Sequence, residues 1–261
     1  MLKWYIHIVP PSWCSENCHN TWFINNLGTG EGAPKWEADT FINFFKHLSG
    51  CKYYIGFGTW IGPTLFYAAQ LVDEAFGIEA DPVAFAQVET NLALNKNSPW
   101  ASRVRLNHHA VGLGFDDKNA TPSIASMSSA SAGNSCSGLG KVACGKASVF
   151  WNVNAYPLPY LLKHWDVPAT NQLFIKVDVE SFECQLVPSW LPWLQSIEGK
   201  KPIFHIALHS QIVKCSQDEY KQIYQFGSLF DFKHDACMDK DKEEWIGHGC
   251  GEGEFLFYDA P

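Results

Sequence analysis

The sequence lacks two features that would tie it to a membrane or to nucleic acid. No apolar run approaches the roughly 20 residues of a transmembrane helix, so we expect no membrane-spanning segment. Basic residues are outnumbered, with 19 Lys and Arg against 27 Asp and Glu and a formal charge of −8. Because this acidic balance is spread along the chain, it argues against binding to a phosphate backbone. It is compatible with a small molecule or a sugar as partner.

An internal repeat and a signal peptide are also missing. The opening MLKWYIHIVPP is too short, and too soon ended by prolines, to be a secretory signal. The 261 residues are 46% apolar, which allows a sizeable core and suits one large domain. We predict an N-terminal extension over residues 1–50, with a helix at 35–49, followed by an α/β domain over residues 51–261. The sequence does not indicate an oligomeric state.

The cysteines are scattered and odd in number, nine in all. Cys51 and Cys184 lie in apolar patterns typical of buried thiols, which favours a reducing compartment and a cytoplasmic location. A zinc site is the alternative, because a C-x-x-x-C-H pattern occurs early in the chain and further ligand types occur late in it. Its possible ligands are Cys14, Cys18, His19, Cys237, His248 and Cys250. Ordinary free thiols are the favoured interpretation.

Strand and helix patterns alternate along the chain. The predicted strands lie at 52–55, 74–79, 103–111, 172–179 and 202–209, and the predicted helices at 63–71, 81–95, 156–165, 182–194 and 216–226. Two further strands, at 229–237 and 254–259, look like an antiparallel pair. This order predicts an α/β fold with a Rossmann-like, doubly wound seven-stranded sheet whose last strand is antiparallel. A Ser-, Gly- and Ala-rich insertion at 112–148 is expected to be a lid, a binding loop or a disordered segment.

A glycine-rich loop follows the first strand, in YIGFGTWIGPT. Gly56, Gly58 and Gly62 form G-x-G-x-x-x-G, which lets the backbone approach a ligand at the carboxyl end of the strand. Glu79 lies 21 residues after Gly58, at the end of the second strand, where an acid can accept both hydroxyls of a ribose. Together these features indicate an adenosine-type cofactor. The alternative is a tight strand-to-helix turn followed by an acid at a helix start.

Two cofactors fit such a loop. NADP prefers a basic residue near the end of the second strand, where this sequence has Glu79, Ala80 and Asp81. S-adenosylmethionine carries a ribose and a sulfonium cation, and it suits an acidic pocket. The sequence therefore favours S-adenosylmethionine and disfavours an NADP oxidoreductase.

A second group of ionisable residues ends the fourth strand, in IKVDVESFE. Period-2 alternation places Lys176, Asp178 and Glu180 on one face, and Glu183 follows just beyond. Charged groups at the end of a buried central strand are costly unless they are paired or functional. A core ion pair between Lys176 and one of the two acids is the structural alternative.

Six segments resemble the FkbM family of S-adenosylmethionine-dependent methyltransferases: KWE, GFGTWIG, FGIEADPVAFAQVETNLALN, HHAVG, FIKVDVESFE and PIFHIALH. The resemblance runs across most of the chain. It implies a class I methyltransferase fold and O-methyl transfer, with a sugar or glycan hydroxyl as the favoured acceptor. The family's fourth-strand pattern resembles K-I-D-V-E-G-x-E; this chain keeps all its charged residues and has Ser181 in place of the glycine.

The chain departs from the family at one important position. The first motif of the family resembles D-x-G-x-x-x-G, and Gly56 stands where its acid should be. In similar methyltransferases that acid helps to hold the amino group of the cofactor's methionine part. Losing one charge-assisted hydrogen bond costs roughly 1.5–3 kcal/mol. A water molecule or Glu37 could substitute for it, although Glu37 could equally be a solvated acid at a helix start.

Gly56 therefore also supports a different interpretation. It could mark a degenerate, non-catalytic cofactor-binding module. The other charged residues of the expected site are intact, which argues against decay of the whole site; they are Glu79, Lys176, Asp178, Glu180 and Glu183.

Methyl transfer to a hydroxyl needs alignment and a base. Lys176, Asp178 and His209 are the candidate catalytic residues, with Asp178 facing the methyl region and His209 as general base or as a structural histidine. His205, four residues earlier, is more typical of a core position. A divalent metal between Asp178, Glu180 and His209 is possible by ligand type but is not required.

The expected cofactor contacts come from the glycine loop and from the ends of the neighbouring strands. His109 and Ala110 are expected near the adenine ring, while Phe57 and Trp60 are expected as walls of the loop or as packing beneath it. The full set is Glu37, Gly56, Phe57, Gly58, Thr59, Trp60, Gly62, Glu79, Ala80, Asp81, His109, Ala110 and Asp178.

Overall fold

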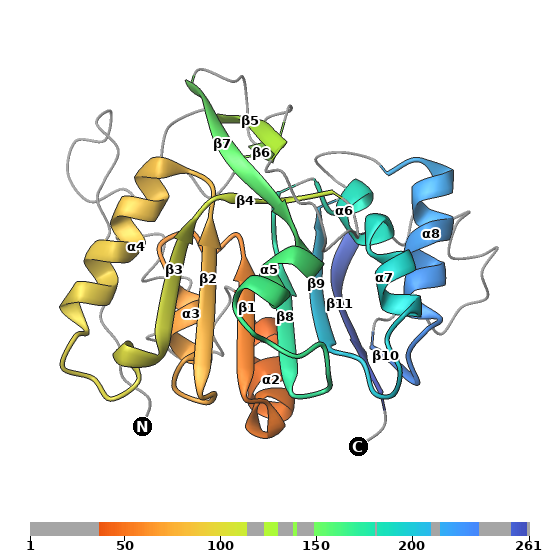
Figure 1. The fold of residues 1–261 in the computed structure, drawn as a ribbon, viewed down its shortest axis with the longest axis horizontal. Helices are drawn as coiled ribbons and strands as arrows, with labels where there is room; N and C mark the ends of the chain where they lie inside the picture. Colours follow the sequence, from red (N-terminus) through yellow and green to blue (C-terminus); the bar gives the residue numbers. More distant parts are fainter. Residues whose placement is uncertain are drawn as a thin grey trace.

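A seven-stranded, mostly parallel sheet lies at the centre of the computed structural model (Figure 1). The structure describes residues 37–113, 123–129, 138–139, 149–180, 182–209, 215–234 and 252–259. The helices are α2 (Ala38–His47), α3 (Pro63–Ala68), α4 (Pro82–Leu94), α5 (Leu158–His164), α6 (Glu183–Ser189), α7 (Leu191–Gln195) and α8 (Gln217–Gly227). The strands are β1 (Tyr53–Phe57), β2 (Glu74–Glu79), β3 (Val104–His108), β4 (Ala110–Gly112), β5 (Ser123–Ser129), β6 (Gly138–Leu139), β7 (Val149–Pro157), β8 (Leu173–Val177), β9 (Ile203–His209), β10 (Phe232–His234) and β11 (Glu252–Tyr258).

The strand order of the main sheet is β10-β11-β9-β8-β1-β2-β3. β1 pairs in parallel with both β2 and β8, while β11 runs antiparallel to its neighbours β9 and β10. This is the Rossmann-like arrangement of a class I methyltransferase, and the predicted antiparallel last strand is confirmed. The strand order reverses beside β1, so the carboxyl ends of β1, β2 and β8 form the edge where doubly wound sheets bind ligands.

Helices cover both faces of this sheet and bury apolar side chains against it. Ile55 packs in a core with Trp190 at the end of α6, whereas Tyr54 packs in a second core with Phe44 from α2. Successive residues of a strand point to opposite faces, so neighbours in β1 serve different cores. α2 precedes the first strand, and it is nevertheless part of the second core.

Most predicted elements are confirmed within a few residues, and the differences have local causes. The helix expected at 182–194 is divided into α6 and α7 around Trp190, with Pro188 inside the last turn of α6. The strand expected at 103–111 breaks at His109 into β3 and β4. The helix expected at 156–165 begins only at Leu158, because Pro157 holds the extended backbone that ends β7.

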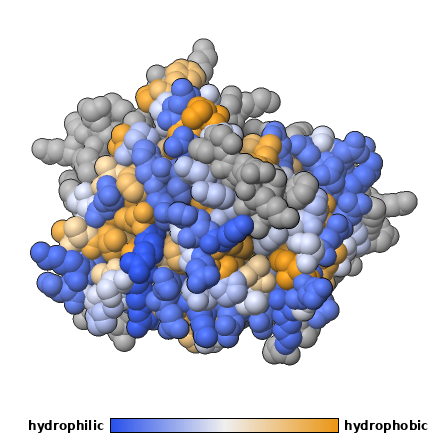
Figure 2. Space-filling view, in the orientation of Figure 1, coloured by the Kyte–Doolittle hydropathy of each residue, from blue (hydrophilic) through white to orange (hydrophobic). Residues whose placement is uncertain are grey.

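A second, smaller sheet lies above the edge at which β1, β2 and β3 end (Figure 1). Its order is β4-β7-β5-β6, and β5 pairs antiparallel with β7. The insertion at 112–148 is therefore not irregular throughout, since 123–129 form a strand. Figure 2 shows hydrophobic surface on the part of the molecule that stands above the main sheet. Ala125 and Met127 are buried, while Ile124 and Phe150 are exposed. Small and hydroxyl side chains hid this alternation from the sequence analysis.

The cysteines behave in two ways. Cys51 is buried with a free thiol, and burial raises the pKa of that thiol to about 12. Cys184 is instead joined to Cys215 by a disulfide, so its interpretation as a buried free thiol is wrong. The argument for a reducing compartment loses one of its two supports. Across the described residues, no helix has the length and apolar character needed to cross a membrane.

Candidate active site

The glycine loop between β1 and α3 folds tightly against the ends of β2 and β8. Gly58 has φ +76°, and a Cβ built on it would lie 1.7 Å from the carbonyl oxygen of Asp178. Gly62 has φ +102° and no room beside Phe66. Both glycines are therefore required by conformation and by space. The Gly58 N–H donates to the carbonyl of Ile78 at 3.0 Å, which fixes the loop to β2.

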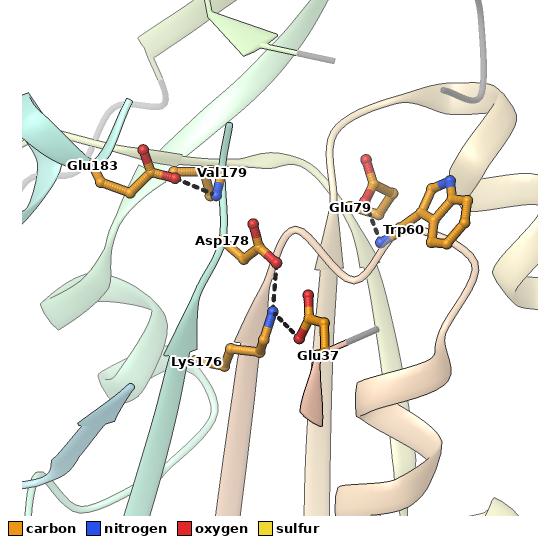
Figure 3. Close-up of polar contacts among 7 residues, drawn as sticks. All are labelled: Glu37, Trp60, Glu79, Lys176, Asp178, Val179 and Glu183. Atoms are coloured by element: carbon orange, nitrogen blue, oxygen red, sulfur yellow. Dashed lines mark hydrogen bonds and ion pairs between the residues drawn. The ribbon is translucent and has the colours of Figure 1, made fainter. Parts of the chain in front are cut away.

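Glu79 ends β2 with its carboxyl group turned toward this loop (Figure 3). One carboxyl oxygen accepts from the backbone N–H of Trp60 at 2.7 Å, and the other accepts from the N–H of Asp81 at 2.8 Å. Burial raises the pKa of Glu79 to about 7, against the opposing effect of these two donors. Glu79, the acid that was expected to bind a ribose, thus also connects the glycine loop at Trp60 to the start of α4 at Asp81.

Lys176, Asp178 and Glu37 converge beside the end of β1 (Figure 3). The Lys176 Nζ atom is 2.5 Å from an oxygen of Asp178 and 3.4 Å from an oxygen of Glu37. Burial alone would lower the pKa of Lys176, but the two carboxylates outweigh it and hold that pKa above its ordinary value. The ammonium group is therefore charged, as the predicted core ion pair requires, with Glu37 as an additional partner.

Glu180 does not continue the strand face that alternation predicted. β8 ends at Val177, and Glu180 has a left-handed backbone with φ 50°. The strand period therefore does not extend to it. Glu183 is fully buried, and its carboxylate accepts from the N–H of Val179 at 2.9 Å. This acid stabilises the turn that follows Asp178.

Several predicted cofactor contacts have structural roles in this loop. Phe57 is fully buried beside Trp190, with ring centroids 6.1 Å apart, so its ring packs beneath the loop. Thr59 is buried, and Trp60 adopts a left-handed backbone with φ 48° while its N–H binds Glu79. Asp81 caps α4 by accepting from the N–H of Val83 at 2.8 Å, as a helix-start acid would.

His109 and Ala110 lie where the chain leaves the main sheet for the second one. Burial lowers the pKa of His109 to about 4, so its ring is neutral near pH 7. That ring packs edge-on against Tyr156 at 5.2 Å. Nearby, the indole N–H of Trp151 in β7 donates to the carbonyl of Ala80 at 2.9 Å. This bond connects the second sheet to the segment after Glu79, and no pattern in the sequence predicts it.

The two histidines of β9, His205 and His209, lie in different environments. His205 is fully buried, 6.1 Å from the ring of Phe44 and 6.4 Å from that of Phe174, in agreement with the expected core position. His209 ends β9 opposite Glu252, and its side chain lies outside the described atoms. Its role as general base stays a prediction.

The possible metal sites are not tested by the structure. In the described parts of the chain, no three His, Cys, Asp or Glu side chains gather as metal ligands would. The site proposed between Asp178, Glu180 and His209 depends on a side chain outside that description. The possible zinc ligands, Cys14, Cys18, His19, Cys237, His248 and Cys250, also lie outside it.

Comparison with known proteins gives structural similarity only. No protein-family model matches the chain, and no curated protein sequence does either. The methyltransferase FkbM from Methylobacillus flagellatus KT is 11% identical with a TM-score of 0.43; the match covers 80% of this chain and 44% of that protein. This chain thus spans less than half the length of that relative.

Two further solved structures are similar over 90% and 74% of their own lengths. The O-methyltransferase from Bacillus cereus in complex with SAH is 12% identical with a TM-score of 0.44, covering 93% of this chain and 90% of that one. Precorrin-6y C5,15-methyltransferase from Geobacter metallireducens GS-15 is 11% identical with a TM-score of 0.39, covering 76% and 74%. At these identities and TM-scores, none of the three bears on the activity of this chain.

Proposed function

We propose that the chain is an S-adenosylmethionine-dependent O-methyltransferase of FkbM type, with a sugar or glycan hydroxyl as the favoured acceptor. One observation carries the proposal. Acidic groups from the end of β2, from the residue after β8 and from the residue before α2 lie around the glycine loop at the carboxyl edge of the sheet (Figure 3). Such an edge is where doubly wound sheets bind nucleotide-like cofactors.

The charges of this edge suit S-adenosylmethionine. Glu37 and Asp178 share one lysine, so this buried group carries one net negative charge, and Glu79 adds to it when ionised. S-adenosylmethionine has a sulfonium, an ammonium and a carboxylate, which leaves it with one net positive charge. NADP is strongly anionic and would meet repulsion here. Glu79 would accept the ribose hydroxyls, and Gly58 would let the backbone approach the cofactor.

The remaining chemistry would come from the cofactor and the acceptor together. When bound, S-adenosylmethionine supplies an activated methyl group on its sulfonium. Asp178, fixed by Lys176 at the end of β8, would orient the acceptor hydroxyl in line with that methyl group. His209 at the end of β9 would remove the hydroxyl proton. The second sheet, which stands above this edge, would line the acceptor side (Figure 1).

Calorimetric titration with S-adenosylmethionine, S-adenosylhomocysteine and NADPH tests the cofactor assignment. We expect the first two to bind and NADPH not to bind. Glu79→Gln should weaken S-adenosylhomocysteine about ten- to a hundredfold, because charge-assisted bonds to the ribose are lost. Failure of the wild type to bind either adenosyl ligand would contradict the proposal.

Transfer of a labelled methyl group tests the reaction itself. The wild type, Asp178→Asn and His209→Ala are compared on a panel of sugars and glycans. We expect incorporation by the wild type and a loss of about a hundredfold or more in His209→Ala. Tight cofactor binding without transfer to any acceptor would instead favour the non-catalytic binding module.

A further inference from the structure

The packing around Gly56 explains why this position has no acidic side chain. Gly56 lies within regular β1, paired with Gly77 on one side and Lys176 on the other, so its backbone does not demand glycine. A Cβ at this position would lie 2.9 Å from the hydroxyl oxygen of Tyr54 and 3.1 Å from its ring. Real Cβ atoms rarely tolerate such contacts. Tyr54 therefore occupies the space that a side chain at position 56 would need.

Tyr54 cannot easily leave this position. It is fully buried, and its ring centroid lies 5.4 Å from that of Phe44 and 6.2 Å from that of Phe174. Burial raises the pKa of Tyr54 above its ordinary value, while Lys176 and a hydrogen bond with Thr64 act against it. The phenol is thus neutral, and it does not replace the charge of the missing acid.

Glu37 brings a carboxylate to the same place from another element. Lys176 is the direct neighbour of Gly56 in the sheet, and Glu37 lies 3.4 Å from its ammonium group. Glu37 holds a left-handed backbone with φ 51°, a conformation that ordinary residues adopt at a cost. Its side chain keeps 17% of its surface exposed, whereas that of Lys176 keeps only 3%. The acid therefore lies between the buried lysine and the outside.

We infer that Glu37, positioned by Lys176, accepts the ammonium group of the cofactor's methionine part in place of a first-motif acid, and that Tyr54 makes this relocation necessary. The inference rests on the proposed function. Asp178 already lies closest to Lys176, so neutralising the lysine does not by itself require Glu37. A carboxylate can accept about four hydrogen bonds, so an ion pair with Lys176 leaves capacity for a ligand.

Binding of two ligands distinguishes the contact with Glu37 from the contacts made by the rest of the cofactor site. S-adenosylhomocysteine carries the amino acid part, and 5′-methylthioadenosine lacks it but keeps the adenosine. Glu37→Gln should weaken S-adenosylhomocysteine about ten- to a hundredfold and 5′-methylthioadenosine less than about twofold. Glu89→Gln, at an exposed position of α4, is the matched control and should change neither.

Restoring an acid at position 56 of β1, in a variant that lacks the charge of Glu37, is a stronger test than removing that charge alone. Tyr54→Phe removes the oxygen nearest to a new Cβ, so Gly56→Asp is made in that background and combined with Glu37→Gln. This triple variant should regain at least about tenfold of the lost affinity for S-adenosylhomocysteine, with thermal unfolding used to select folded protein. Glu37→Asp, which keeps the charge but shortens the side chain, gives a second measure if Glu37→Gln folds poorly.

The outcomes are distinct. Equal loss for both ligands, or no loss for either, would overturn the role of Glu37 and leave the proposed function standing. A wild type that binds neither ligand would overturn the proposed function and this inference together. Selective loss for S-adenosylhomocysteine, with rescue by the triple variant, supports it.

Discussion

Glu79 is a buried carboxyl group whose ionisation the fold opposes. Its pKa is raised to about 7 by burial, whereas the unfolded chain titrates near 4.5. Between these values the folded protein holds a proton that the unfolded chain has released. The contribution of Glu79 to the unfolding free energy is therefore most favourable below pH 4.5. It falls by about 3 kcal/mol as the pH rises from there through 7.

Urea unfolding at pH 5 and pH 8 measures this effect. The difference in unfolding free energy between the wild type and Glu79→Gln cancels the other titrating groups. We expect this difference to move against the wild type by up to about 3 kcal/mol between the two pH values. If the unfolding free energies of the two proteins change in parallel with pH, ionising Glu79 does not destabilise the folded state.

At the scale of elements, the disulfide joins α6 to the residue that precedes the N-cap of α8. Cys184 and Cys215 are 31 residues apart, and the bond closes the loop that contains α7 and β9. Closing a loop of this length stabilises a fold by about 3–4 kcal/mol in the chain-entropy model. The variant with both cysteines changed to serine should lose stability by that amount.

Dithiothreitol supplies the control for this prediction. It should lower the unfolding midpoint of the wild type by more than that of the double serine variant. Alkylation of the denatured, unreduced protein should spare Cys184 and Cys215 and modify Cys51. Modification of all three would contradict the bond.

Elements that the sequence predicted poorly share a physical cause. The strand at 123–129 is made of Ser, Ala, Ile and Met, and its buried side chains include Ser128 as well as Ala125 and Met127, so its apolar alternation is weak. β3 and β4 are separated only by His109, and no local signal in the sequence marks the change of sheet there. Pairing with strands distant in the sequence determines both the strand at 123–129 and the break at His109. The strongly apolar strands and the capped helices, such as α4 behind Asp81, were predictable because their signals are local.

The same division holds for the candidate site. Glu79 and the group at Lys176 were found from strand ends and charge, which the sequence displays. The pairing of Glu37 with Lys176, and the contact between Tyr54 and Gly56, depend on a helix and two strands meeting in space. A bulky residue two positions before a glycine in a strand was the available signal, since both share a face.

At the scale of the whole molecule, α2 packs in the second core with strands of the sheet, so we expect the two to unfold together, although α2 lies in the predicted N-terminal extension. Phe44 on α2 is fully buried against Tyr54 and Phe174, whereas its neighbour Phe45 is 75% exposed. Phe44→Ala should reduce the unfolding free energy by about 3–5 kcal/mol. Phe45→Ala, the matched control, should change it by less than about 0.5 kcal/mol.

Chemical denaturation followed by two probes checks this statement. Tryptophan fluorescence and far-ultraviolet circular dichroism should give coincident transitions for both variants. An early transition confined to Phe44→Ala would mean that α2 unfolds separately from the sheet.

The place of β11 between β9 and β10 constrains how the protein is made. β11 follows both neighbours along the chain, yet β10 joins the sheet through it. During synthesis on a ribosome, β9 would therefore wait with an open edge until β11 has emerged. Such an edge can pair with another nascent chain. A chain truncated before residue 252 should thus aggregate more readily than a chain that includes β11.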